Sequence, residues 1–406
     1  MEHDQILIRL HVLHLKTVIL CEVQSHKNTN VWGWRPLARD STTPRPFTVA
    51  IPQRALEDLR SRIRATQWPE AETHASQGVS RRDLEFLTTY WADSYDWRRC
   101  ELALNASPQL ITEIQGLDIH AIHVRSRHEH ALPIVLTHGW PGSVLEFLDV
   151  IGPLVDPPDA SDAFHVVVPS LPGYGFSGKP TRPGWNVDRI ARAWVDLMAR
   201  LGYDRFAAQG GDWGAMVTTA IGRNHPDHVI GIHLNMPQGK EPVGSYDLSE
   251  RDKRAVSSMA AFFTTGHGYL LEQRTRPQTL AYGLADSPVA LCAWILEKLM
   301  DWADGDPLSD DQKLDDVTLY WLTGTAASAA RLYWENPRGP DLAPVDVPTG
   351  CSLFPGEPLS VPRPYAEQVY CDLRFWHELD RGGHFPAWEQ PELFVSEIRQ
   401  FFRMLR

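Results

Sequence analysis

Residues 210–214 read Gly-Gly-Asp-Trp-Gly and lie between a predicted strand, Phe206 to Gln209, and a predicted helix, Trp213 to Arg223. The spacing Gly-x-nucleophile-x-Gly is typical of a nucleophile elbow, a strand-to-helix turn so tight that a side chain on either flank would clash. Asp212 occupies the apex, where such elbows more often carry serine. The same residue types also fill ordinary surface turns, so the partners of Asp212 decide between these two interpretations.

A carboxylate at the apex predicts a particular class of substrate. Aspartate has a reference pKa of about 4, so it is ionised at neutral pH and needs no base to act as a nucleophile. Its attack on an ester would give an unstable anhydride, whereas its attack on a saturated carbon gives an alkyl ester that lasts until water is delivered. We therefore expect targets such as epoxides or carbon–halogen bonds. The N-terminus of the following helix is expected to favour the ionised form of Asp212.

Hydrolysis of such an ester needs a histidine as base and an acid that orients it. Among 17 histidines, His384 follows a glycine pair in the loop between the predicted strand Leu373 to Leu379 and an amphipathic helix. Glu357 directly follows another predicted strand, whereas Asp346 and Asp372 are rival acids that do not. The chain order of nucleophile, acid and histidine is the order that α/β-hydrolases share. The alternative for Glu357 is an ordinary solvated loop glutamate.

Backbone N–H groups must also stabilise the oxyanion that forms when water attacks the ester. The loop Thr137 to Ser143 follows the predicted strand Pro133 to Leu136, where these donors are expected. We predict that the N–H groups of Trp140 and Trp213 form the oxyanion hole, that the Trp140–Pro141 peptide bond is cis, and that these two loop residues contact substrate. A plain Pro-Gly turn is the alternative.

Motifs spread from about Phe47 to the C-terminus are similar to those of one known family. In the first part they are Phe47 to Arg64, Gln67-Trp68-Pro69, Tyr90-Trp91, Asp96-Trp97-Arg98, Asn105 and Ile114 to His120. In the second part they are His138 to Pro141, Pro172 to Ser177, the elbow, Pro355-Gly356-Glu357 and Gly382-Gly383-His384. The chain thus resembles the epoxide hydrolases of the microsomal and juvenile-hormone type. That resemblance implies an α/β-hydrolase fold: a mostly parallel sheet flanked by helices, with an inserted helical cap and an N-terminal segment that wraps the core.

The resemblance also implies two tyrosines in the cap that face the epoxide oxygen. Tyr269 and Tyr333 lie in segments similar to the cap motifs of the family, and we take them as the candidates. Ring opening generates an alkoxide far more basic than a phenol of pKa about 10, so a tyrosine can give it a hydrogen bond or a proton. The alternative is that these are 2 of 11 tyrosines packed in a helical core.

Strand and helix patterns divide the chain into segments. Residues 126–238 and 346–406 are predicted as the two parts of the core, 239–345 as the cap, and 46–125 as the N-terminal epoxide hydrolase segment. Within residues 47–115, helices are expected around Leu56, Leu59 and Ile63, and around Leu84, Leu87 and Trp91. One strand is predicted just before the first core part, Ile119 to Val124, and four are predicted within it: Pro133 to Leu136, Phe164 to Val168, Phe206 to Gln209 and Val229 to Leu234. A core helix is predicted from Val187 behind the N-cap Asn186, and a cap helix from Val289 behind Ser287-Pro288.

The first 45 residues match none of these motifs. Ile6 to Cys21 is apolar but is interrupted by Arg9, His11, His14 and Lys16, and it is shorter than the roughly 20 apolar residues of a membrane span. We expect no membrane anchor, and therefore a soluble enzyme. Residues 1–45 are expected to be a disordered extension or to precede the native start of translation.

Composition narrows the partners. The net charge of −12 argues against nucleic acid or an anionic membrane as a partner. Five scattered cysteines show no metal-binding spacing, and we expect them to be small buried hydrophobic residues in the reducing cytoplasm. No metal and no cofactor is expected. The sequence leaves open whether the protein is a homodimer.

Together these features predict an epoxide hydrolase, with a role in detoxification, that converts a small hydrophobic epoxide and water to a vicinal diol. Asp212 attacks the ring carbon, Tyr269 and Tyr333 act on the oxygen, and His384 with Glu357 activates water. One alternative is a haloalkane dehalogenase with the same aspartate nucleophile. Another is an inactive relative that binds an apolar ligand.

Overall fold

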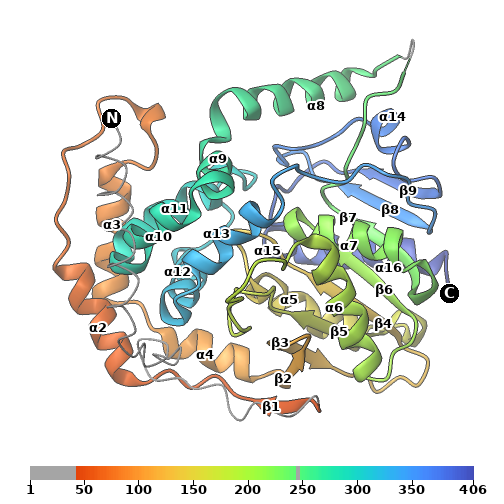
Figure 1. The fold of residues 1–406 in the computed structure, drawn as a ribbon, viewed down its shortest axis with the longest axis horizontal. Helices are drawn as coiled ribbons and strands as arrows, with labels where there is room; N and C mark the ends of the chain where they lie inside the picture. Colours follow the sequence, from red (N-terminus) through yellow and green to blue (C-terminus); the bar gives the residue numbers. More distant parts are fainter. Residues whose placement is uncertain (1–42, 244–246) are drawn as a thin grey trace, which may run out of the picture. The chain divides into compact units, whose positions relative to one another are not determined.

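A nine-stranded sheet is the centre of the computed structural model, which describes residues 43–243 and 247–406 (Figure 1). The strands are β1 (Arg45–Phe47), β2 (Gln109–Ile114), β3 (Leu117–Val124), β4 (Leu132–Thr137), β5 (Phe164–Pro169), β6 (Phe206–Gly210), β7 (Val229–Leu234), β8 (Thr349–Leu353) and β9 (Leu373–Glu378). Their spatial order is β1-β2-β3-β5-β4-β6-β7-β8-β9. The pairs from β5 to β9 are parallel, and the pairs among β1, β2, β3 and β5 are antiparallel. The expected mostly parallel sheet is confirmed.

The predicted core strands are present and differ from the prediction only at their ends. The helices expected around Leu56 and Leu87 are present, at Gln53–Arg64 and Arg81–Asp93. Strand β2 was not among the predicted strands, and the structure places it between β1 and β3. Five of the six residues of β2 are buried. A strand covered in this way lacks the strict alternation of apolar and polar residues by which a half-exposed strand is recognised.

Helices on the sheet pack as two pairs. Helix α5 (Leu148–Val155) contacts α16 (Pro391–Arg403), and α6 (Val187–Arg200) contacts α7 (Asp212–Asn224). Helix α6 buries one apolar face, and the Asn186 side chain accepts a hydrogen bond from the backbone N–H of Arg189 at 3.1 Å, as expected of an N-cap. These helices and the strands between them enclose the core of the fold.

Only helices and loops connect β7 to β8 in the part of this connection that the structure describes. The helices are α8 (Glu250–Ala261), η5 (Phe262–Gly266), α9 (Gly268–Thr275), α10 (Pro277–Asp286), α11 (Pro288–Asp301), α12 (Asp310–Thr323) and α13 (Ala326–Glu335). Ser287 caps α11, whose first residue is proline, as the sequence predicts. This insertion supplies the residues that cover the site described below.

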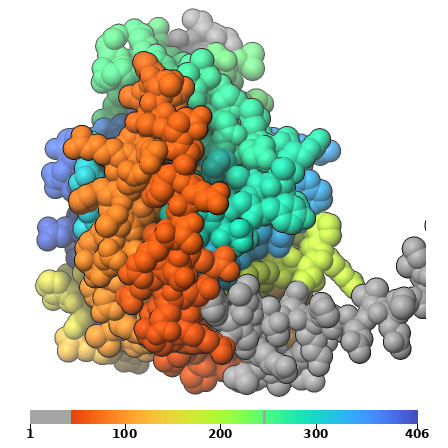
Figure 2. Space-filling view, turned by 90° about the vertical axis from the view of Figure 1, so that its left-hand side faces the viewer, coloured from red at the N-terminus to blue at the C-terminus, as the bar shows by residue number. Residues whose placement is uncertain are grey.

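The N-terminal segment lies along the insertion. Its helices are α2 (Gln53–Arg64), α3 (Arg81–Asp93) and α4 (Trp97–Asn105). Figure 2 shows this orange segment side by side with the green to teal helices of the insertion. Several hydrogen bonds join the segment to α12. Among them, Trp91 Nε1 donates to Thr318 Oγ1 at 2.8 Å, and Tyr95 Oη donates to Asp315 Oδ1 at 2.7 Å. The segment therefore braces the insertion from outside.

Three other expectations concern the periphery. Most of residues 1–45 lie outside the described residues, and Arg45 already belongs to β1. Of the cysteines in the described ranges, Cys371 is exposed, contrary to the expectation that each is buried. Within these ranges no single helix has the length and apolar composition to cross a bilayer, and only the pair α10 and α11, bent by 117°, meets that criterion when taken together.

Candidate active site

The elbow at Asp212 forms a tight turn between β6 and α7. Asp212 has a φ of +49°, a left-handed conformation that is uncommon for a residue other than glycine. A Cβ atom on Gly210 would overlap the backbone oxygen of Gly214, and a Cβ atom on Gly214 would overlap the backbone oxygen of Thr137. Both flanking positions thus require glycine for the steric reason expected from the sequence.

The Asp212 carboxylate lies between backbone donors and a histidine. The N–H of Trp140 donates to Asp212 Oδ1 at 2.7 Å, and the N–H of Trp213 also interacts with the carboxylate. Burial raises the pKa of Asp212 above its ordinary value, while His384 and the two N–H groups lower it by less. The helix N-terminus acts in the expected direction, and burial is the larger effect.

His384 pairs with the acid that directly follows a strand. Its Nδ1 lies 2.6 Å from Glu357 Oε2, and its Nε2 lies 3.8 Å from Asp212 Oδ2. The backbone N–H of Leu359 donates to the other oxygen of Glu357 at 2.9 Å, which fixes the carboxylate in place. The rival Asp372 instead pairs with Arg374 at the surface. The structure therefore brings Asp212, Glu357 and His384 together.

The charge state of His384 depends on its acidic neighbours. Burial lowers the pKa of His384. The charge and hydrogen bond of Glu357 and the charges of Asp212 and Glu146 together outweigh this effect, and the pKa is raised to about 9. A pKa of about 9 favours the protonated imidazole at neutral pH. Any reaction that neutralises Asp212 removes one of the charges that hold this proton.

Sequence reasoning missed the residues that hold the His384 loop. The Glu389 carboxylate accepts hydrogen bonds of 2.8 Å from the N–H groups of Gly383, Phe385 and Asp304. The N–H of His384 itself donates to the backbone oxygen of Trp302 at 2.9 Å. These bonds tie the loop to the end of α11. Nothing in the sequence distinguishes Glu389 from a solvated glutamate, because its partners come from a segment that is distant along the chain.

Tyr269 from α9 and Tyr333 from α13 lie together above the elbow. Their ring centroids are 5.9 Å apart, and the Tyr333 ring lies 4.7 Å from that of Trp213 in an edge-to-face arrangement. Both side chains are buried, and burial raises the pKa of each phenol well above its ordinary value. Tyr333 Oη has no hydrogen-bond partner among residues 43–243 and 247–406. Both hydroxyls therefore keep their protons at neutral pH.

The loop before the elbow supplies one wall of the site. The Trp140–Pro141 peptide bond is cis, as the sequence predicts. The Trp140 indole stacks on the Tyr269 ring, with centroids 5.1 Å apart and an interplanar angle of 10°. The centroid of the Trp302 ring lies 5.3 Å from that of Tyr269 and 4.9 Å from that of His384. The sequence did not single out Trp302 among 15 tryptophans.

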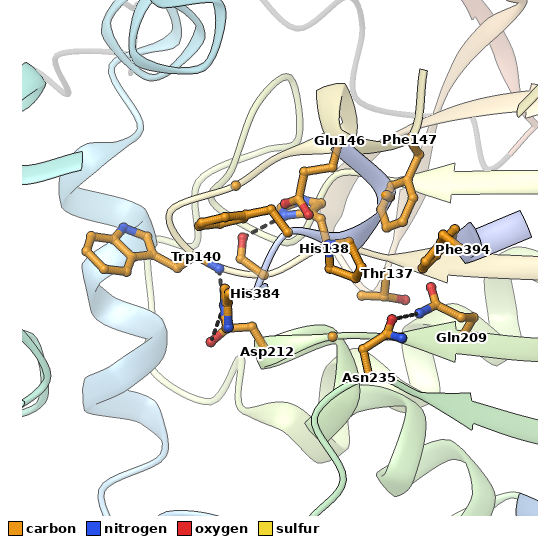
Figure 3. Close-up of a pocket in the computed structure, with 16 residues that line it drawn as sticks. Thr137, His138, Trp140, Glu146, Phe147, Gln209, Asp212, Asn235, His384 and Phe394 are labelled. Carbon is orange, nitrogen blue, oxygen red and sulfur yellow. Dashed lines mark hydrogen bonds and ion pairs between the residues drawn. The ribbon is translucent and has the colours of Figure 1, made fainter. Parts of the chain in front are cut away.

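Topology explains why these residues meet. Trp140, Asp212, Glu357 and His384 each follow the carboxyl end of a parallel strand, namely β4, β6, β8 and β9, and these ends share one edge of the sheet. Figure 3 shows Trp140, Asp212 and His384 meeting there. In the described part of the chain no three His, Cys, Asp or Glu side chains are grouped to hold a metal ion.

Comparison with protein-family models gives two matches. Residues 44–147 match the model described as epoxide hydrolase N terminus, and residues 133–276 match the model of the α/β hydrolase fold. These matches and the solved structures below confirm the expected α/β-hydrolase fold.

Similar proteins cover nearly the whole chain. A putative epoxide hydrolase of Stigmatella aurantiaca (strain DW4/3-1) is 54% identical over 89% of this chain and 85% of its own length. Epoxide hydrolase 1 of Sus scrofa is 35% identical over 92% of this chain and 91% of its own length. The structure of Aspergillus niger epoxide hydrolase is 35% identical, with a TM-score of 0.84 and coverage of 91% of this chain and 98% of that one. Juvenile hormone epoxide hydrolase of the silkworm Bombyx mori is 30% identical, with a TM-score of 0.85 and coverage of 91% and 96%.

Proposed function

This chain belongs to the epoxide hydrolase family, and we propose that it hydrolyses small hydrophobic epoxides to vicinal diols through an ester on Asp212. The observation that supports this proposal most directly is the position of the Asp212 carboxylate. Asp212 accepts a hydrogen bond from the Trp140 N–H, faces His384 at 3.8 Å, and lies beneath two buried tyrosines. A carboxyl nucleophile, a histidine and proton donors are therefore present in one site.

In the first step Asp212 attacks a ring carbon. The bond between that carbon and the epoxide oxygen breaks, and the oxygen takes a hydrogen bond or a proton from Tyr269 and Tyr333. Their raised pKa values support this role because both phenols stay protonated and can donate. These donors also favour an epoxide over a haloalkane as substrate, because a halide leaving group needs no proton.

In the second step water attacks the ester carbonyl. Esterification removes the negative charge of Asp212, which is one of the charges that raise the pKa of His384 to about 9. The pKa of His384 therefore falls once the ester has formed, and the neutral imidazole can accept a proton from water. The N–H groups of Trp140 and Trp213, which interact with the carboxylate in the free protein, are the donors for the oxyanion.

A panel of epoxides tests this function with wild type and the variant Asp212→Asn beside each other. Wild type should form diol and the variant should not. Asp372→Asn is the matched control, because Asp372 is a surface aspartate paired with Arg374 at 2.7 Å. Equal diol formation by Asp212→Asn and wild type from the first time point would contradict the proposal. Activity that rises only slowly with storage would instead indicate deamidation of the asparagine to aspartate.

A further inference from the structure

A small cavity adjoins the Asp212 carboxylate. Its volume is about 20 Å³, and Asp212, His384 and Glu146 line it together with Gln209 and Asn235. Neither tyrosine of the site is among its lining residues. Figure 3 shows Glu146 entering this pocket from one side and Gln209 and Asn235 from the other. A volume of about 10–15 Å³ suffices for one water molecule, so the cavity can hold a water beside both Asp212 and His384.

The Glu146 carboxyl group is fixed at the wall of this cavity. Glu146 belongs to η2 (Val144–Phe147), directly after the loop that carries Trp140, and only 8% of its surface is exposed. Its Oε1 lies so close to Gly142 that a Cβ atom there would overlap it, and the N–H of Ser143 interacts with the carboxyl group. No side chain in the described ranges donates a hydrogen bond to it. Its remaining hydrogen-bonding capacity is thus available on the cavity side.

Glu146 and His384 interact electrostatically across the cavity. Burial and the charge of Asp316 raise the pKa of Glu146, the positive charge of His384 opposes this rise, and the result is a pKa of about 8. In return, the charge of Glu146 contributes to the raised pKa of His384. Both residues line the same small cavity, so a water molecule in it can lie beside both.

The far side of the cavity is also polar. Gln209 donates through Nε2 to Asn235 Oδ1 at 2.6 Å, whereas Gln209 Oε1 is buried without a hydrogen-bond partner in the part of the chain that the structure describes. Buried acceptors that lack a protein partner are commonly satisfied by internal water. These polar groups are available as hydrogen-bond partners for a water molecule in the cavity.

We propose that Glu146 binds the hydrolytic water in this cavity and holds it between His384 and the ester carbonyl of Asp212. This inference rests on the proposed function. In the step, the water oxygen bonds to the carbonyl carbon, one proton passes to His384, and Glu146 keeps the hydrogen bond to the other. The bond between the carbonyl carbon and the alkoxy oxygen then breaks. His384 returns its proton to the departing diol. The other water proton, now on the Asp212 carboxyl group, passes to the tyrosine that gave up a proton in ring opening, or to the alkoxide if none was given, and the Asp212 carboxylate is restored.

Single-turnover experiments with excess enzyme can separate the two steps for each variant. Mixtures of enzyme and a hydrolysed epoxide are quenched over time, and protein mass spectrometry measures how fast the ester forms and decays. For Glu146→Leu we expect ester formation within a few-fold of wild type and ester hydrolysis roughly 100-fold slower, so that the ester accumulates. Glu146→Gln should restore most of the hydrolysis rate, because its amide can still bind water in the same place.

The matched control is Asp316→Asn. Asp316 is a buried carboxyl whose pKa is also raised to about 8 by burial, and it accepts a hydrogen bond from Ser143 at 2.7 Å without lining the cavity. This variant should keep both rates within a few-fold of wild type. If Glu146→Leu does not fold, Glu146→Asp replaces it, since the shorter side chain withdraws the carboxyl group and should slow hydrolysis alone.

Two outcomes would overturn the role of Glu146. In one, loss or shortening of the side chain slows both steps equally or neither. In the other, Asp316→Asn slows ester hydrolysis as much as Glu146→Leu does, which would assign the effect to buried charge near the loop. Failure of wild type to form any ester is a different result, because it would refute the ester mechanism itself.

Discussion

Replacing Tyr333 by phenylalanine should make the protein more stable and less active. The Tyr333 side chain is 3% exposed and packs against Trp213 and Tyr269, yet its hydroxyl has no hydrogen-bond partner within residues 43–243 and 247–406. A buried hydroxyl without a partner costs about 1–3 kcal/mol, and Tyr333→Phe removes that cost while it keeps the ring. We therefore expect the free energy of unfolding to rise by about 1 kcal/mol or more.

The same substitution removes one of the two donors that we propose for the epoxide oxygen. Loss of one preorganised donor to a developing oxyanion typically slows the chemical step by about 10²–10³-fold. Ester formation in a single turnover should slow by about that factor, and urea unfolding of the same preparation gives the change in stability. A stabilised but slow enzyme is the expected result, because the unpaired hydroxyl is held ready for the substrate.

Tyr95→Phe is the matched control. Tyr95 is also buried, but its hydroxyl donates to Asp315 Oδ1 at 2.7 Å, between the N-terminal segment and α12. This variant should lose about 1.5–3 kcal/mol of stability, as expected for a hydrogen bond to a charged group, and keep its rate of ester formation. The reasoning is refuted if Tyr333→Phe is destabilised as Tyr95→Phe is, or if it forms the ester at the wild-type rate.

Three further variants test the electrostatics of the site. Glu357→Gln removes the charge and the strongest hydrogen bond that hold the pKa of His384 at about 9, so the pH profile of ester hydrolysis should shift to lower pH, and an unchanged profile would argue against this pairing. Glu389→Gln should lower the free energy of unfolding by about 2 kcal/mol and speed hydrogen exchange in the His384 loop, because an amide cannot accept all three N–H groups. Burial raises the pKa of Asp316 from 3.8 to about 8. Between pH 3.8 and about 8 the folded state therefore binds more protons than the unfolded chain, and stability falls as the pH rises through this range. Asp316→Asn should flatten this fall in urea titrations from pH 5 to 9, and a decline as steep as that of wild type would contradict it.

Local signals made much of the fold predictable. The strand β7 could be placed to the residue because Val229 to Leu234 is a short apolar run bounded by polar residues. The start of α6 could be placed because Asn186 caps it. Strand β2 could not be placed from the sequence, since it pairs with β1 and β3 on its two edges and most of its side chains are buried. Pairing across the sheet, which the sequence does not display, determines that strand.

The same distinction applies to the site. Asp212, His384 and Glu357 could be recognised because each follows a predicted strand, and the structure brings them together. Their electrostatics were less predictable. The net pKa shift of Asp212 is set mainly by its burial, which the helix N-terminus opposes and which depends on side chains from several elements. Glu146 and Glu389 gain their surroundings only when distant segments meet, and the sequence around each is that of an ordinary helix or turn.

The origin of the new hydroxyl oxygen of the diol distinguishes an ester mechanism from direct attack by water. One turnover is run with excess enzyme in water labelled with heavy oxygen, and the diol and the peptide that contains Asp212 are both analysed by mass spectrometry. We predict an unlabelled diol and one labelled oxygen in the Asp212 carboxylate, because the carboxylate oxygen enters the product and water replaces it. A labelled diol together with an unlabelled peptide would show that water opens the epoxide directly.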